Sequence, residues 1–115
     1  MSQFSTSSII DNLHKEIQKK KCASPEKSYV AKLFQEGEDK VLKKIGEEST
    51  EVILASKGNQ KSCIVHEMAD LLFHSLVMLE MKEIHYKEVL QELQNRLGVS
   101  GIEEKKRRSL DKRQP

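Results

Sequence analysis

The sequence has no tryptophan, two prolines, five glycines and two cysteines among its 115 residues, and only 4% of them are aromatic. Proteins built from β-sheets are richer in aromatic and β-branched residues, so this composition, with its abundant Glu, Lys and Leu, favours an all-α fold. Cys22 and Cys63 stand far apart and without a CxxC motif. They predict free thiols in a reducing compartment rather than a disulfide framework.

The sequence also lacks a large excess of positive or negative charge, and it lacks long hydrophobic runs. The formal net charge of +2 is too small to predict a nucleic-acid partner. The first residues, Met1-Ser2-Gln3-Phe4, lack the charged segment and apolar run of a signal peptide. No stretch approaches the roughly 20 apolar residues of a membrane span. We therefore expect a cytoplasmic protein with neither a membrane nor a nucleic acid as partner.

Apolar residues recur at helical spacing in five segments. The periodicity predicts helices over residues 6–20, around 30–34, and over 38–57, 62–82 and 86–97. A chain of this length forms one small domain, which we place at residues 1–98, followed by a charged, flexible tail over 99–115. The expected architecture is an α-helical bundle of about five helices. Within it, we expect Cys63 in the core and Gly46 at a close helix approach or beside a ligand.

Two acidic motifs lie on the third and fourth of these helices. They read Glu47-Glu48-x-x-Glu51 and Glu67-x-x-Asp70, and residues three or four apart share one face of a helix. A rotation of about 100° per residue puts Glu48 and Glu67 at the edge of the apolar faces, with Glu51 and Asp70 about 60° further round. Each helix thus carries one carboxylate at the core margin and another one step outside it.

Each motif alone is common on solvated helix surfaces. Lys43 or Lys44 could pair with Glu47 or Glu48 and only stabilise the helix. Together, however, carboxylates that abut apolar residues on neighbouring helices are costly to leave unpaired. A hard cation such as Mg²⁺ relieves this cost, takes oxygen ligands and supports phosphate chemistry. The lack of a Cys/His cluster argues against zinc.

Three further side chains are candidates for substrate binding. Lys44 faces the acidic cluster and Lys40 lies close by, so either could contact a polyphosphate or be an ordinary solvated lysine. His74, one turn after Asp70, could hydrogen-bond a ligand carboxylate or the nucleotide. The alternative for His74 is a buried histidine with a structural hydrogen bond.

The spacing of the two acidic motifs resembles the signature of the all-α nucleotide pyrophosphohydrolase (MazG-like) superfamily. Within this superfamily, the chain is similar to the phosphoribosyl-ATP pyrophosphohydrolase family over about residues 26–97. The similarity rests on four blocks: Ser28-Tyr29, Gly37-Glu38, Lys43-Lys44-x-Gly46-Glu47-Glu48 and Ala69-Asp70-Leu71-Leu72-Phe73-His74.

The resemblance implies Mg²⁺-dependent hydrolysis of the α–β phosphoanhydride of phosphoribosyl-ATP, the second step of histidine biosynthesis, which yields phosphoribosyl-AMP and pyrophosphate. It also implies a homodimer whose helices complete each other's bundle. The implied metal ligands are Glu48, Glu51, Glu67 and Asp70, with Glu47 as a further ligand or a water-orienting base. Two alternatives stay open: a house-cleaning (d)NTP pyrophosphatase of the same superfamily, and a non-enzymatic helical interaction module.

Overall fold

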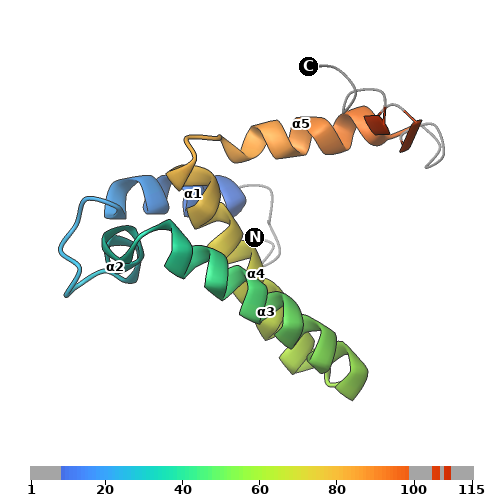
Figure 1. Ribbon diagram of the computed structural model, residues 1–115, viewed down its shortest axis with the longest axis horizontal. Coiled ribbons are helices and arrows are strands. Elements are labelled where there is room, and N and C mark those ends of the chain that lie inside the picture. Colours follow the sequence, from blue (N-terminus) through green and yellow to red (C-terminus); the bar gives the residue numbers. More distant parts are fainter. Residues whose placement is uncertain (1–8, 99–104, 107, 110–115) are drawn as a thin grey trace, which may run out of the picture. The chain divides into compact units, whose positions relative to one another are not determined.

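A computed structural model describes residues 9–98, 105–106 and 108–109 of the chain. Its helices, in order, are α1 (Ile9–Lys20), α2 (Tyr29–Glu36), α3 (Glu38–Gly58), α4 (Lys61–Met81) and α5 (Tyr86–Arg96) (Figure 1). No strand occurs in the described ranges, so the predicted all-α class is confirmed. The predicted start of the first helix at residue 6, and most of the predicted tail, lie outside the described residues.

The chain divides after Ile84 into two compact units. The first contains α1 to α4, and the second contains α5. Residues that bear on the acidic motifs all belong to the first unit. A single domain over residues 1–98 stays a prediction.

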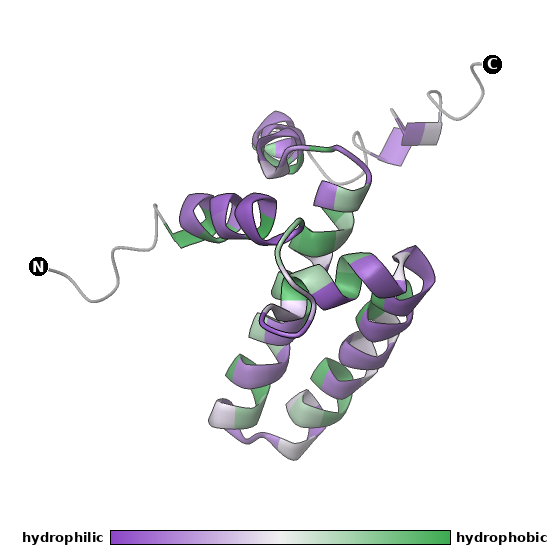
Figure 2. Ribbon diagram, turned by 90° about the vertical axis from the view of Figure 1, so that its left-hand side faces the viewer, coloured by the Kyte–Doolittle hydropathy of each residue, from purple (hydrophilic) through white to green (hydrophobic). Residues whose placement is uncertain are grey.

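Helices α3 and α4 form a long antiparallel hairpin, and their mutual packing is the most extensive in the chain (Figures 1 and 2). Gly58 ends α3, and Asn59 follows in the left-handed conformation, with φ of 59°. Asn adopts this conformation more readily than most residues, so the turn suits its sequence. The hairpin places the two acidic motifs opposite each other.

The core lies at the end of the hairpin away from this turn, where α1 and α2 pack against it (Figure 1). One fully buried residue comes from each of the four helices: Ile17, Leu33, Val41 and Val77. Two ion pairs close the same end. Lys21 Nζ lies 2.6 Å from Glu80 Oε2, and Lys82 pairs with Glu38.

The turn half of the hairpin is not covered in the single chain. Five large apolar side chains there are 39–62% exposed, namely Ile53, Leu54, Val65, Met68 and Leu72; we call them the hairpin patch. The helical periodicity of residues 62–82 predicts that Val65, Met68 and Leu72 face inward, and that prediction is wrong for the single chain. The reason is that α4 is apolar on more than one face: Phe73, Leu76 and Val77 belong to the core or pack against it, and Val65, Met68 and Leu72 lie elsewhere on the helix. A two-helix hairpin buries only one face of each helix.

Helix α4 is long and apolar enough to cross a membrane, although we expected no stretch of this chain to be so. It has 21 residues, and its most apolar window has a mean hydropathy of 1.3, so it could cross a membrane by length and composition. The core helix of a soluble bundle meets the same two criteria. Length and apolarity therefore do not assign α4 to a membrane.

Candidate active site

Glu48 and His74 meet between α3 and α4. The Glu48 side chain is only 12% exposed and that of His74 only 6%. Glu48 Oε1 lies 2.6 Å from His74 Nδ1, while the same nitrogen is 3.0 Å from the backbone carbonyl oxygen of Asp70. The Asp70 carbonyl oxygen takes the Nδ1 hydrogen bond, and Glu48 Oε1 makes no well-aligned hydrogen bond with a described residue. Burial has the largest effect on the pKa of the Glu48 carboxyl and raises it, although the nearby His74 ring lowers that pKa. A buried carboxylate oxygen thus has no well-aligned donor, which is costly unless a cation approaches it.

Tyr29 reaches the other side of the same imidazole. Its hydroxyl lies 2.8 Å from His74 Nε2, and its ring stacks on Phe73 with a centroid separation of 5.9 Å. Ser28 fixes this tyrosine at the first turn of α2, because its Oγ accepts a hydrogen bond from the Ala31 N–H. Burial raises the pKa of the Tyr29 phenol, and the charges of nearby carboxylates add to the rise. The hydroxyl therefore stays protonated and donates to Nε2.

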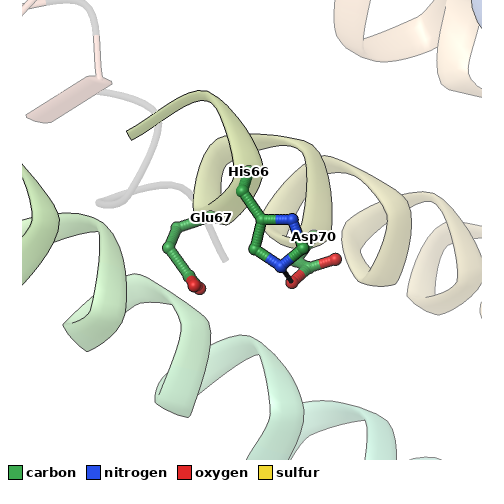
Figure 3. Close-up of side chains that lie close together, drawn as sticks. All are labelled: His66, Glu67 and Asp70. Atoms are coloured by element: carbon green, nitrogen blue, oxygen red, sulfur yellow. Dashed lines mark ion pairs between the residues drawn. The ribbon is translucent and has the colours of Figure 1, made fainter. Parts of the chain in front are cut away.

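Asp70 and Glu67 extend the site along α4, together with His66. One ligand atom from each of these three residues lies within 4.8 Å of the others. His66 Nε2 is 3.3 Å from Asp70 Oδ2, whereas Glu67 points from α4 towards α3 (Figure 3). The negative charge of Asp70 raises the pKa of Glu48, so these two carboxylates interact across the hairpin.

Glu51 and Glu67 face each other one turn nearer the hairpin turn. Both line a groove of about 380 Å³ between the helices, with Leu54 and Ala55 among its walls. Asp70 thus acts electrostatically on Glu48, and Glu51 and Glu67 share one groove. Cys63 also lines this groove and is exposed, so its predicted place in the core is wrong.

Residues 10–97 match the phosphoribosyl-ATP pyrophosphohydrolase family. The chain belongs to this family. It is 49% identical over 111 residues to a protein of Nitrosomonas eutropha. The alignment covers 96% of this chain and 95% of the relative. A Trichlorobacter lovleyi protein is 50% identical over 84% of the chain and 90% of its own length, and a Geobacter sulfurreducens protein 50% identical over 88% and 94%. Each of these relatives is named phosphoribosyl-ATP pyrophosphatase.

Family membership makes the chain a hydrolase, which excludes the non-enzymatic interaction module. The match also extends the similarity that we inferred over residues 26–97 to include α1. Of the four metal ligands that the family resemblance proposed, Glu67 and Asp70 lie close together on α4. Glu48 is an electrostatic neighbour of Asp70, and Glu51 lines one groove with Glu67. Their roles stay predictions.

The remaining predicted residues differ in their burial and in the groups near them. Lys44 is half-buried, and its positive charge lowers the pKa of Glu48, so it acts on the acidic cluster. Lys40 is exposed and lies 3.9 Å from Glu36, at the start of the hairpin. Glu47 is exposed. Gly46 has open space where a Cβ would stand, so the predicted close helix approach is absent.

Sequence reasoning missed two residues of the site. His66 is one helical turn before Asp70, and this i, i+4 spacing could have identified it. Tyr29 and His74 are 45 residues apart, a distance that no helical periodicity spans. The family block Ser28-Tyr29 was the only available signal for Tyr29.

We expect Glu48→Gln to stabilise the metal-free protein by about 0.5–2 kcal/mol near neutral pH. Burial raises the pKa of the Glu48 carboxyl above its ordinary value of 4.5, Asp70 adds to the rise, and His74 and Lys44 oppose it. A raised pKa means that this group favours folding below 4.5 and that the contribution is lost as the pH rises through the folded value. The advantage of Glu48→Gln should therefore shrink as the pH falls towards 4.5.

Urea unfolding followed by circular dichroism at several pH values measures this difference. Glu47→Gln is the matched control, because it removes the same charge from an exposed neighbour and should change the stability by less than about 0.5 kcal/mol. A Glu48→Gln protein less stable than the wild type at neutral pH would contradict the interpretation of Glu48 as an uncompensated buried charge.

Proposed function

We propose that this protein hydrolyses the α–β phosphoanhydride of phosphoribosyl-ATP, with Mg²⁺ as cofactor, and so performs the second step of histidine biosynthesis. Support for the substrate comes from family membership and from relatives that carry this activity in their names. Support for the cofactor comes from the chemistry of the hairpin. The observation that carries the proposal is the buried Glu48 carboxylate, whose Oε1 makes no well-aligned hydrogen bond with a described residue and whose electrostatic neighbour is Asp70.

The donor set fits a hard divalent cation. Carboxylate oxygens suit Mg²⁺, and α3 and α4 carry the four proposed ligands on the two helices of one hairpin. Of the two imidazoles near them, His66 is exposed and His74 is buried, with both ring nitrogens in contact with other groups. In the proposal, Glu48, Glu51, Glu67 and Asp70 hold the cation. Bound Mg²⁺ would neutralise phosphate oxygens and lower the pKa of an attacking water.

The chain's own residues then have separate tasks. Lys44, half-buried beside Glu48, adds a positive charge for the polyphosphate. Glu47 is exposed one residue before Glu48 and could accept the proton of the attacking water, since it is not committed to the buried centre. Lys40, already near Glu36, would contact only a substrate that extends beyond the hairpin.

The experiment that tests this function is a substrate panel. Purified protein with Mg²⁺ is given phosphoribosyl-ATP, canonical nucleoside triphosphates and oxidised or deaminated triphosphates, and pyrophosphate release is measured. We expect kcat/KM for phosphoribosyl-ATP to exceed every other value by about 10³-fold or more, as expected when a site is built to hydrogen-bond groups that the other substrates lack. A comparable or higher value for a triphosphate would instead support a house-cleaning pyrophosphatase.

We further propose a cytoplasmic homodimer. The hairpin patch exposes five large apolar side chains on two adjacent helices, and contiguous exposed apolar surface of this kind is characteristic of interfaces. A second copy of the chain that covers both hairpins would complete a four-helix arrangement. The two free cysteines, both exposed, suit a reducing compartment.

A further inference from the structure

His74 is held at both ring nitrogens by groups from different helices. Its Nδ1 lies 3.0 Å from the Asp70 carbonyl oxygen and 2.6 Å from Glu48 Oε1. Both neighbours are oxygen acceptors, so Nδ1 carries the proton. Nε2 is then an acceptor in the neutral ring, and the Tyr29 hydroxyl, 2.8 Å away, is its donor. The contacts thus define one tautomer of the imidazole.

This arrangement places Tyr29 at the start of a chain of contacts that ends on Glu48. Tyr29 stands on α2, His74 on α4 and Glu48 on α3, so the chain ties three helices together. Two aromatic contacts keep the imidazole in its plane: the ring centroid of His74 is 5.1 Å from that of Phe73 and 5.7 Å from that of Tyr29, both edge-on. The His74 ring therefore has a fixed orientation, and the Glu48 carboxylate lies in contact with it.

We propose that Tyr29 is a positioning residue for the cation site: its hydroxyl fixes the tautomer and orientation of His74, and His74 holds the Glu48 carboxylate in the orientation that binds the cation. The inference rests on the proposed Mg²⁺ site. It replaces the earlier candidate role of His74 in direct substrate binding, because that side chain is only 6% exposed. Residues that orient a ligating group in this way contribute about 10–100-fold to metal affinity.

A direct contact with the substrate is the alternative role for Tyr29. Its side chain borders an open cavity of about 560 Å³ lined by Lys27 and Lys32, so a substrate that entered this cavity would touch the tyrosine directly. A direct contact would act on KM for the nucleotide at saturating metal. A positioning role acts on the affinity for the cation, and increasing the Mg²⁺ concentration would restore kcat.

Tyr29→Phe separates these roles, because it removes one hydroxyl and keeps the ring that stacks on Phe73. We expect calorimetry without nucleotide to give a Kd for Mg²⁺ about 10-fold weaker than in the wild type. At saturating Mg²⁺, kcat and KM should return to wild-type values. Tyr86→Phe is the matched control, since the chain has only two tyrosines and Tyr86 belongs to the second unit; its Kd should be unchanged.

A second readout needs no cation. Nitrogen NMR of the His74 ring in the metal-free protein should show the Nδ1–H tautomer in the wild type and a changed Nε2 signal in Tyr29→Phe, with His74→Asn used for assignment. His74→Asn also keeps an N–H near the position of Nδ1 but loses the partner of Tyr29. Adding Tyr29→Phe to it should therefore cause no further loss of Mg²⁺ affinity.

The outcomes distinguish the inference from the function on which it rests. A wild-type protein that binds no Mg²⁺, even with a nucleotide analogue present, refutes the cation site itself. Binding by the wild type with an equal Kd in Tyr29→Phe overturns only the positioning role. Unchanged His74 signals, or a raised KM for the nucleotide at saturating metal, would also overturn it.

Discussion

Replacing Glu48 by Gln is expected to lower kcat/KM for pyrophosphate release by about 10³-fold or more, equivalent to at least about 4 kcal/mol of transition-state stabilisation. The substitution preserves the size of the side chain and removes its charge. The Glu48 side chain is only 12% exposed, and its Oε1 makes no well-aligned hydrogen bond with a described residue. An amide at this position contributes no negative charge to a cation, so the contribution of the metal to the reaction is lost.

Asp70→Asn should have a similar effect, because Asp70 faces the same centre from α4. Glu92→Gln on α5 is the control: it removes the same charge from an exposed residue that pairs with Arg96, 3.0 Å away. All three proteins should keep the helical circular dichroism of the wild type. Full activity in both Glu48→Gln and Asp70→Asn would refute the assignment of the metal site.

Replacing Leu72 by Asp is expected to convert the proposed dimer into a monomer. Leu72 is 50% exposed in the single chain and belongs to the hairpin patch on α4, one and two turns from Met68 and Val65. A charge placed at the centre of an apolar interface should weaken association by at least about 2 kcal/mol, or roughly 30-fold in Kd. Because the side chain is not part of the core, the monomer should remain folded.

Analytical ultracentrifugation over a range of protein concentrations measures this change. Asn59→Asp adds the same charge at the hairpin turn, where Asp tolerates the left-handed conformation, and it should leave the dimer intact. A wild-type protein that sediments as a monomer throughout, or a Leu72→Asp protein that still dimerises, would contradict the proposed interface.

The sequence predicted the helices well, because their ends are set by local chemistry. Gly37 separates α2 from α3 with φ of 99°, and Gly58-Asn59 ends α3 where periodicity placed its end. Amphipathic rotation also placed Glu48 at the core margin correctly. The same rotation did not predict the relative burial of the two acids on α4. Glu67 and Asp70 are both half-buried, since α4 is apolar on more than one face.

What the sequence could not supply depends on contacts between distant segments. Periodicity relates residues on one helix, whereas Tyr29 reaches His74 from a different helix. Periodicity also left two interpretations for Gly46, a close helix approach or space beside a ligand, and the open space at this position excludes only the first. Val65, Met68 and Leu72 of the hairpin patch were assigned to a core, but the single chain leaves them exposed.

The most direct test of the account is phosphorus NMR of phosphoribosyl-ATP incubated with the wild-type protein, with and without Mg²⁺. The proposed Mg²⁺-dependent hydrolysis predicts that, with Mg²⁺, the substrate signals are replaced by those of pyrophosphate and phosphoribosyl-AMP, and that no reaction occurs after chelation of the metal. Release of orthophosphate, or equal turnover in the presence of chelator, would contradict it.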